Sequence, residues 1–283
     1  EDTGIWKPKD VSGLTFGNNG FYLDFEDSSA LGDDVSGNNN DFTVNNLTSV
    51  DQSTDTCTNN FCTLNPNDTA TDSSASFKIS DGNLVLGDVG SNDNDMGLRA
   101  TMGVLSGKWY WEVKKLETAG TIGIVSSQVD ITGGDVVNND TICSRNISSN
   151  GTGSSLVYWN NSNFTNNASL QGYGANDIIG VALDMDNGKL YFSINGVFKG
   201  FNNSSSDPAA GTNANFTDIP TDKGFIMPYV EKRGTADPSD QFNFGNPSFS
   251  VSSGNTDGKY GNFEYQPPSG FYALCTKRIA EYG

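Results

Sequence analysis

The stretch IIGVALDMDNGKLYFSI, residues 178–194, decides the fold class. Two apolar runs in it flank the dipeptide Asn187-Gly188. Because Asn-Gly readily adopts the positive φ angles of a tight hairpin turn, this pattern predicts two antiparallel strands joined by that turn. A second dipeptide, Asn195-Gly196, follows and predicts another reversal into a short strand at 197–200.

Further strands are predicted on both sides of this hairpin. In KWYWEVK, residues 108–114, successive side chains of an extended chain point to opposite faces, so Trp109, Trp111 and Val113 share one face. Apolar and aromatic runs predict other strands at 20–25, 83–86, 121–125, 225–230 and 241–245. Short strands at this spacing predict an all-β fold, an antiparallel two-sheet β-sandwich with loop-rich insertions.

The composition argues against several classes of protein. The chain has 283 residues, with 34 acidic and 16 basic side chains, a net charge of −18 and no His. No nucleic-acid partner is expected, because phosphate binding requires a basic surface. No apolar run approaches the roughly 20 residues of a membrane-spanning helix, so no membrane insertion is expected. Without His, the chain lacks the commonest general base and the commonest metal ligand.

Four segments resemble, in the same order, the SPRY family, whose fold belongs with the concanavalin A-like sandwiches. They are GKWYWEV, GYGANDIIGVALDMDNGKLYFSINGV, FIMPYV and FNFGNPSF, at residues 107–113, 172–197, 225–230 and 242–249. The resemblance implies a jelly-roll sandwich over residues 103–250 that is not catalytic and displays loops for protein or glycan contact. An Asn/Ser/Thr-rich insertion between Val136 and Leu170 departs from the family pattern, and we expect it to be a loop.

The flanks of this region carry a second resemblance. Residues 6–48 and 265–276 are similar to segments around SPRY-like regions in virion proteins of tailed phages, especially phages from aquatic environments. No Pro-rich or Gly/Ser-rich linker separates the first hundred residues from the middle of the chain. We therefore expect residues 1–102 to pack on or complete the sandwich, and residues 251–283 to form a C-terminal extension.

Acceptor sites for N-glycosylation, Asn-x-Ser/Thr, are frequent in the chain. The eleven candidates are Asn46, Asn67, Asn139, Asn146, Asn150, Asn160, Asn163, Asn167, Asn202, Asn203 and Asn215. Six of them fall within residues 139–169, which indicates a glycan-coated loop on an extracellular protein. The alternative is that an Asn/Ser/Thr-rich stretch produces the pattern by chance.

Cysteine usage also fits the outside of a cell or particle. Cys57 and Cys62 lie five positions apart in a Thr/Asn-rich stretch, where a disulfide between them closes a small ring. Cys143 and Cys275 either pair with each other or stay reduced, because the sequence does not choose among the connectivities. A Cys-x4-Cys pair without His is a poor zinc pattern, so no metal site is expected there.

No cofactor is expected, with calcium as the alternative. The run Asp184–Gly188 begins like an EF-hand loop, but Lys189 stands at the sixth position and the hairpin explains these residues. Asn92–Asp95 and Asp33-Asp34 are better calcium candidates, because nothing else in the sequence explains their density of oxygen ligands. Solvated turns are the other explanation of these two runs.

Glu112 and Glu117 are the candidates for the carboxylate pair of a sandwich glycanase. Alternation along a strand, however, places them on opposite faces, and Lys114-Lys115 stands where an acidic partner is expected. The chain also lacks a nucleophile elbow and a phosphate-binding Gly loop. We therefore predict that the protein is not an enzyme and assign no catalytic residue.

Aromatic side chains divide into core and contact candidates. Those on the predicted strands are expected to lie in the core rather than to stack on sugars: Trp109, Trp111, Tyr191, Phe192, Phe242 and Phe244. Tyr158 and Trp159 lie beside the Asn-rich insertion and are the candidates for exposed contact.

The leading hypothesis is a non-catalytic structural protein of the extracellular space or the virion surface. In it, copies of the chain assemble into a multi-copy appendage or fibre through their flanking segments, for example by strand addition. The alternative is an adhesion or receptor-binding module that recognises a cell-surface glycan or protein through residues 138–170. The expected partners are therefore the chain itself and cell-surface glycans.

Overall fold

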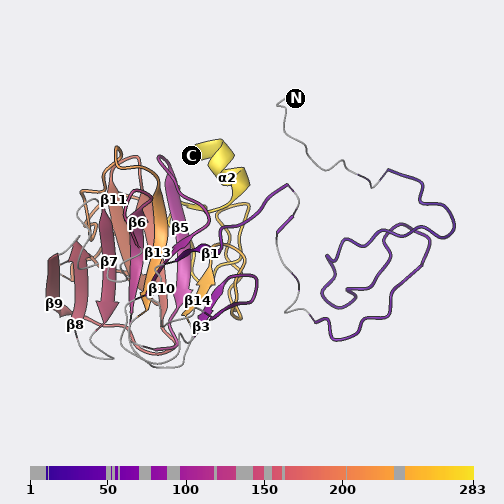
Figure 1. Ribbon diagram of the computed structural model, residues 1–283, viewed down its shortest axis with the longest axis horizontal. Coiled ribbons are helices and arrows are strands. Elements are labelled where there is room, and N and C mark those ends of the chain that lie inside the picture. The colour runs from indigo at the N-terminus through magenta and orange to yellow at the C-terminus, as the bar shows by residue number, and fades with distance from the viewer. Residues whose placement is uncertain are drawn as a thin grey trace. The chain divides into compact units, whose positions relative to one another are not determined.

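The computed structural model describes residues 11, 13–48, 52, 55–56, 58–69, 78–87, 96–117, 120–131, 143–149, 155–160, 163–201, 203–232 and 240–283. The chain divides into two compact units, residues 1–60 and residues 61–283. The strands lie in the second unit, where they form two layers (Figure 1).

Both layers are β-sheets. Among the described residues, the first sheet has seven strands in the spatial order β1 (Leu64–Thr69), β4 (Met96–Ala100), β13 (Ile226–Lys232), β6 (Thr121–Ser126), β7 (Ser144–Ser149), β8 (Ser155–Asn160) and β9 (Asn163–Gln171). The second has eight, in the order β12 (Val197–Phe198), β11 (Lys189–Ile194), β10 (Ile178–Asp184), β5 (Lys108–Lys114), β14 (Asp240–Asn243), β3 (Val85–Gly87) and β2 (Lys78–Ser80), with β15 (Tyr272–Ala273) parallel to β5. The helix α2 (Thr276–Tyr282) follows β15.

The hairpin predicted from residues 178–194 is confirmed. β10 and β11 pair in antiparallel register, with Val181 opposite Phe192 and Asp184 opposite Lys189. Gly188 has the positive φ that the turn requires, at 62°. On its other side β10 pairs with β5, so the sequence-predicted strands form the centre of the eight-stranded sheet. The prediction of an all-β, antiparallel two-sheet sandwich is confirmed.

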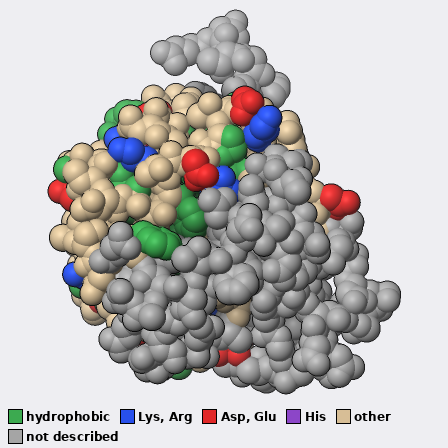
Figure 2. Space-filling model, turned by 90° about the vertical axis from the view of Figure 1, so that its left-hand side faces the viewer, with side chains coloured by type: hydrophobic (Ala, Val, Ile, Leu, Met, Phe, Trp, Pro, Cys, Tyr) green, Lys and Arg blue, Asp and Glu red, His purple; other side chains and the backbone are tan. Residues whose placement is uncertain are grey.

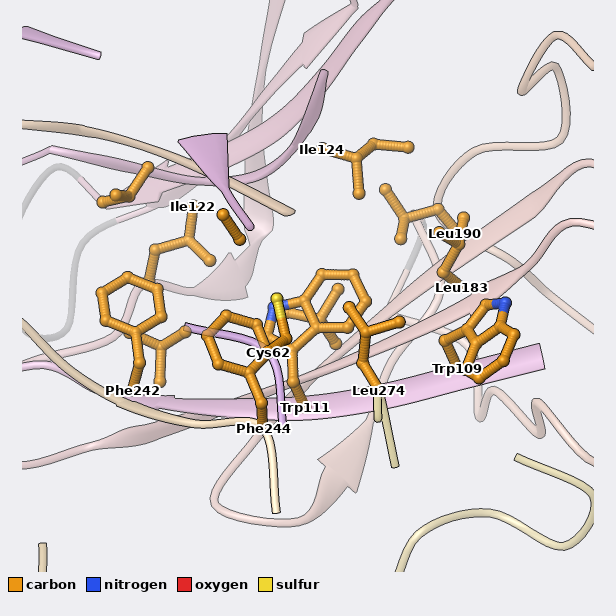
Figure 3. Packing of buried hydrophobic residues seen from close by; sticks show 14 of the residues in the cluster. Cys62, Trp109, Trp111, Ile122, Ile124, Leu183, Leu190, Phe242, Phe244 and Leu274 are labelled. Carbon is orange, nitrogen blue, oxygen red and sulfur yellow. The ribbon is translucent and has the colours of Figure 1, made fainter. Parts of the chain in front are cut away.

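Apolar side chains from both sheets fill the space between them. Trp109, Trp111 and Val113 of β5 are buried there together with Ile122 and Ile124 of the opposite sheet, as Figure 3 shows for four of these residues. The alternation predicted for β5 is therefore confirmed. All six aromatic residues predicted to be core are buried: Trp109, Trp111, Tyr191, Phe192, Phe242 and Phe244.

The outer face of the eight-stranded sheet is buried as well. Tyr110 and Tyr191 project onto this face and pack with Phe263 and Phe271 from residues 251–275, which we call the C-terminal segment. The ring centroids of Tyr110 and Phe263 are 5.2 Å apart in an edge-on arrangement. The C-terminal segment therefore adds a third layer to this side of the sandwich.

The Asn/Ser/Thr-rich insertion is not a loop. Residues 144–171 contain β7, β8 and β9, which extend the seven-stranded sheet, so the prediction of a long loop over 138–170 is wrong. Small polar residues favour turns in isolation, but packing against a neighbouring strand overrides that preference. Here Ile147 of β7 pairs with Ile122 of β6 and is fully buried.

Of two predictions nearer the N-terminus, the first is wrong and the second needs only a change of bounds. Residues 20–25 are not a strand, because the backbone N–H of Tyr22 donates to the side chain of Asp34 instead of joining a sheet. The strand predicted at 83–86 begins only at Val85, since Asp81 and Asn83 adopt positive φ angles of 48° and 65° in the turn before it.

Candidate interaction surface

Hydrogen bonds rather than an apolar core organise the N-terminal unit. The Asp34 side chain is 4% exposed, and Leu31 is the one buried hydrophobic residue among the described residues of this unit. The Asp34 carboxylate accepts hydrogen bonds of 2.8–3.0 Å from the backbone N–H groups of Tyr22, Ser36 and Asn40 and from the Ser36 hydroxyl. One carboxylate therefore ties the two halves of residues 22–40 together.

Large apolar side chains of this unit are exposed. Between 38% and 52% of the surface is exposed in each of seven residues, which we call the exposed apolar set: Leu14, Phe21, Phe25, Val35, Phe42, Val44 and Leu47. The rings of Phe21 and Phe42 contact each other edge-on, with centroids 4.7 Å apart. Because folded domains rarely expose large contiguous apolar areas, the exposed apolar set is a candidate interaction surface.

The charge of this unit limits what that molecule is. Residues 11–60 contain eight Asp and Glu and no Lys or Arg, whereas residues 61–283 carry 14 of the 16 basic side chains. On the face of the molecule drawn in Figure 2, the described Lys and Arg side chains are scattered and form no single patch. An acidic unit repels nucleic acid and anionic lipid, so the partner surface is expected to be apolar and to carry cations.

The pKa of Asp33 is expected to lie above the usual Asp value of 3.8, and the pKa of Asp34 below it. Burial acts to raise the pKa of Asp34, but its hydrogen bonds outweigh burial and lower that pKa to about 2. Partial desolvation, and then the nearby Asp41 carboxylate, raise the pKa of Asp33. Since the folded pKa of Asp34 is depressed, its contribution to stability is present above pH 3.8 and is lost as the pH falls toward 2.

Carboxyl NMR titration of the full chain measures both values. Asp34→Asn identifies the low-pH signal and should remove it. A common midpoint for Asp33 and Asp34 near 3.8 would contradict the hydrogen-bond network.

Glu112 holds the C-terminal segment on the outer face of the eight-stranded sheet. Its carboxylate is fully buried and accepts hydrogen bonds from the backbone N–H groups of Glu264 and Tyr265, at 3.0 and 2.8 Å. The Asn243 side chain and the Tyr110 hydroxyl also donate to it, at 3.0 and 3.1 Å. Burial raises the pKa of Glu112, while these hydrogen bonds act in the opposite direction. The residue thus has a structural role in this fold.

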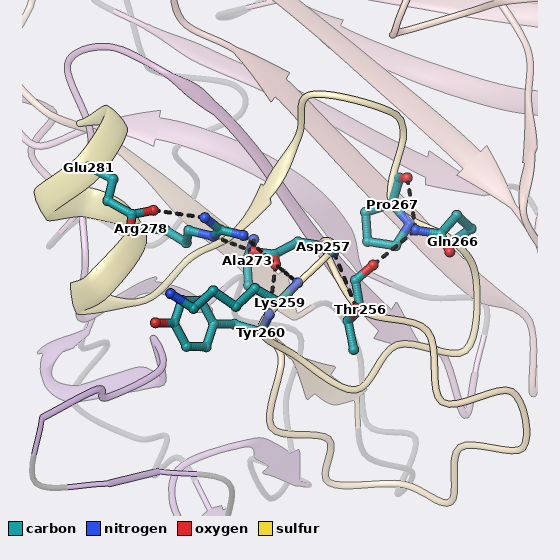
Figure 4. A network of polar contacts seen from close by, with 10 residues as sticks. Thr256, Asp257, Lys259, Tyr260, Gln266, Pro267, Ala273, Arg278 and Glu281 are labelled. Atoms are coloured by element: carbon teal, nitrogen blue, oxygen red, sulfur yellow. Dashed lines mark hydrogen bonds and ion pairs between the residues drawn. The ribbon is translucent and has the colours of Figure 1, made fainter.

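A second anchor joins the C-terminal segment to the helix α2 (Figure 4). The Arg278 guanidinium forms two hydrogen bonds to the Asp257 carboxylate, at 2.9 and 2.8 Å, and one to Glu281, at 2.7 Å. It also lies 4.5 Å from the ring centroid of Tyr272. Burial acts to raise the pKa of Asp257, but Arg278 and two backbone N–H groups hold that pKa below its usual range. The helix α2 is therefore tied to the segment that covers the sheet.

Glu117, the second carboxylate of the glycanase hypothesis, lies outside the strand that carries Glu112. Glu117 follows β5 in a loop and is 8% exposed, while Glu112 is enclosed under the C-terminal segment. Lys115, which stands where an acidic partner was expected, forms an ion pair with Asp240 at 2.8 Å. The structure gives no reason to assign either Glu a catalytic role.

The glycosylation candidates fall into three groups. Asn46, Asn67 and Asn203 are exposed, and glycosylation there stays a prediction. Asn146 and Asn215 are 0% and 8% exposed, and the Asn215 side chain is hydrogen-bonded to the backbone of Phe192 and Lys199, so burial disfavours a glycan at these two sites in the folded chain. The side chains of the others lie outside the described residues: Asn139, Asn150, Asn160, Asn163, Asn167 and Asn202.

The predicted disulfide between Cys57 and Cys62 is not formed in this structure. Cys62 is a buried thiol among core side chains (Figure 3), and Cys57 lies outside the described residues. Burial raises the pKa of Cys62 to about 12, so its thiol is unreactive at neutral pH. Cys143 belongs to the core between the sheets and Cys275 to the cluster on the outer face, so the sheet separates these two.

The calcium candidates gain no support from the geometry. The oxygens of Asp34 face N–H and O–H donors, which disfavour a cation at the same place, and Asn92–Asp95 lies outside the described residues. Asp184 accepts hydrogen bonds from Asn187 in the hairpin turn. Within the part of the chain that the structure describes, no three His, Cys, Asp or Glu side chains are grouped closely enough to hold a metal ion.

Tyr158 and Trp159 lie in β8, in register with Ile147 and Asn146 of β7. Their side chains are outside the described part of the chain, so their exposure stays a prediction. No helix among the described residues has the length and apolar character needed to cross a membrane.

The fold defines an all-β sandwich protein, and comparison with known proteins adds the family. Residues 108–211 match the SPRY domain family, so this chain contains a SPRY domain, as the sequence predicted. The match leaves out β1–β4, β13, β14 and β15, which also belong to the two sheets. SPRY domains commonly act as protein–protein interaction modules.

Two solved structures of SPRY domains are similar to this chain at low sequence identity. The crystal structure of the SPRY domain of human HERC1 is similar over 63% of this chain and 96% of that chain, with 16% identity and a TM-score of 0.45. The crystal structure of the TRIM65 PSpry domain is similar over 65% of this chain and 92% of that chain, with 15% identity and a TM-score of 0.43. No curated protein matches the chain. The resemblance of the flanks to phage virion proteins stays a prediction.

Proposed function

We propose that this protein is a non-catalytic structural protein of the extracellular space or the virion surface, whose copies assemble through the N-terminal unit. The observation that carries the proposal is the exposed apolar set, seven large side chains on a unit with one buried hydrophobic residue among those described. Burying such a side chain contributes about 1.5–3 kcal/mol, so a partner that covers several of them gains substantial affinity.

Exposed apolar side chains, rather than net charge, support a second copy as that partner. Residues 61–283 carry 14 basic and 23 acidic side chains, so another copy offers individual cations but no basic surface. Residues 61–283 also expose apolar side chains, among them Leu105 at 46% and Phe225 at 51%. Their neighbours Val104 and Ile226 pair through an isolated β-bridge, which places the two exposed side chains near one another.

Sedimentation velocity and electron microscopy of the full chain test this proposal. The wild type is expected to form particles far larger than its 30.2 kDa. The double substitution Phe21→Ser and Phe42→Ser removes the contacting ring pair and should shift the protein to a monomer. Asn19→Ser with Thr43→Ser changes exposed polar residues of the same unit and should leave the particles intact.

Two outcomes would contradict the proposal. One is a wild type that stays monomeric at high concentration, and the other is a double variant that assembles as the wild type does. Since Phe21 and Phe42 also contact each other, Phe25→Ser, at a 50% exposed position, separates loss of assembly from loss of local packing. Binding of a glycan or receptor through residues 138–170 stays a prediction.

A further inference from the structure

Lys115 and Asp240 form an ion pair in which neither side chain has any exposed surface. The Lys115 Nζ lies 2.8 Å from Asp240 Oδ2. Lys114 and Gln241 are register partners of β5 and β14, so the next position of each antiparallel strand places Lys115 opposite Asp240. The backbone thus holds the two functional groups in contact.

This pair lies on the side of the sheet that faces the core. Val113 and Phe242 are two positions away on β5 and β14 and are both core residues, so alternation directs Lys115 and Asp240 to the same side. The ring of Tyr173, another fully buried core residue, has its centroid 5.7 Å from the Lys115 Nζ. Water is therefore excluded from both charged groups.

A permanent ion pair is costly at such a place. Removing two ions from water costs several kcal/mol for each, and the pair recovers this only when the remaining donors and acceptors are also satisfied. Among the described residues, Asp240 Oδ1 is buried without a hydrogen-bond partner. The pair Lys108–Asp184 makes a useful contrast, since Lys108 is 27% exposed and Asp184 accepts further hydrogen bonds from Asn187.

We propose that Lys115 and Asp240 react to form an intramolecular isopeptide bond. A proton passes from Nζ to Oδ2 along their hydrogen bond, which leaves a neutral amine and a neutral carboxylic acid. Nζ then attacks Cγ, the C–Oδ2 bond breaks, and Oδ2 leaves as water with a second proton from Nζ. The product is an amide and one water molecule, so the reaction needs no oxidant, reductant or other reactant.

Proximity and burial both favour this reaction. Because the fold holds the amine and the carboxyl group in contact, their reaction is intramolecular and avoids the entropy cost of bringing two molecules together. The amide also removes both buried charges, and the water-free core protects it from hydrolysis. The bond links β5 to β14, two neighbouring strands of the eight-stranded sheet that are far apart in sequence.

Intact mass spectrometry of the denatured full chain tests the proposal, with protein made in bacterial cytoplasm so that no N-glycan obscures the mass. The wild type is expected to be lighter than its sequence by one water molecule. Lys115→Met and Asp240→Ala should restore the full sequence mass. Lys108→Met removes the ion pair between the partly exposed Lys108 and Asp184 instead and should keep the deficit of one water molecule.

Peptide mapping locates the bond and distinguishes it from other dehydrations. The isopeptide gives one branched peptide that joins the segments around Lys115 and Asp240. A succinimide at Asp81-Gly82 or Asp257-Gly258 loses the same mass but stays within one linear peptide. A wild type at full sequence mass, or a deficit without the branched peptide, overturns the proposal even if the core variants fail to fold.

Discussion

Replacing Trp111 with alanine is expected to lower the free energy of unfolding by about 3–5 kcal/mol, the usual cost of removing a large aromatic side chain from a packed core. Trp111 is 1% exposed, and its ring lies 6.3 Å from that of Phe244, centroid to centroid. It belongs to β5, the strand that β10, β14 and β15 all pair with. The cavity left by Trp111→Ala therefore opens at the centre of the sandwich.

Urea unfolding followed by circular dichroism measures this loss without relying on tryptophan fluorescence. Trp111→Phe keeps a ring in the site and should cost less than Trp111→Ala. Val197→Ala removes a side chain that is 56% exposed and should stay within about 0.5 kcal/mol of the wild type, as surface substitutions usually do. Equal effects of Trp111→Ala and Val197→Ala would show that Trp111 does not pack in the core.

The centre of the fold could be predicted from the sequence because local and tertiary signals agree there. Asn187-Gly188 selects the turn of the hairpin, and the alternation in Lys108–Lys114 selects the core face of β5. Where local composition and tertiary packing favour different structures, the prediction from the sequence is wrong. Residues 144–171 have a turn-favouring composition, and only pairing with β6 makes them strands.

The candidate surface was less predictable for a different reason. Phe21 and Phe42 are exposed because the described part of this unit has almost no apolar core to cover them. The sequence did not indicate this, since aromatic residues in an apolar run predict a buried strand. In the structure the buried carboxylate of Asp34 organises this unit, whereas the sequence around Asp34 is typical of a solvated turn. The Lys114-Lys115 pair at the end of β5 was noticeable in the sequence, but Asp240, the partner of Lys115, lies more than a hundred residues further along the chain.

The C-terminal segment shows how a residue type can mislead about function. A Glu on an aromatic strand of a sandwich is typical of a glycanase, and the sequence does not reveal what covers it. In the structure, residues 251–275 return to the outer face of the sheet and place two backbone N–H groups on the Glu112 carboxylate. Glu112 thus joins the SPRY domain to a segment outside the matched residues 108–211.

Replacing Glu112 with alanine is expected to destabilise the sandwich, at a cost of about 1–3 kcal/mol for each buried donor that is left without an acceptor. The backbone N–H groups of Glu264 and Tyr265 and the Asn243 side chain all lose their carboxylate. Urea unfolding measures the loss, and hydrogen exchange should show faster exchange at Glu264 and Tyr265. Glu281→Ala, at a 42% exposed carboxylate that binds Arg278, should cost far less.

The loss caused by Glu112→Ala should also depend on pH in a defined direction. Because burial raises the folded pKa of Glu112 above its usual 4.5, ionisation is less favourable in the folded chain than in the unfolded chain. The advantage of the wild type over Glu112→Ala is therefore greatest below pH 4.5 and shrinks as the pH rises through the folded pKa. An advantage that instead grows with pH would show that the hydrogen bonds from Tyr110, Asn243 and the C-terminal segment outweigh burial at this carboxylate.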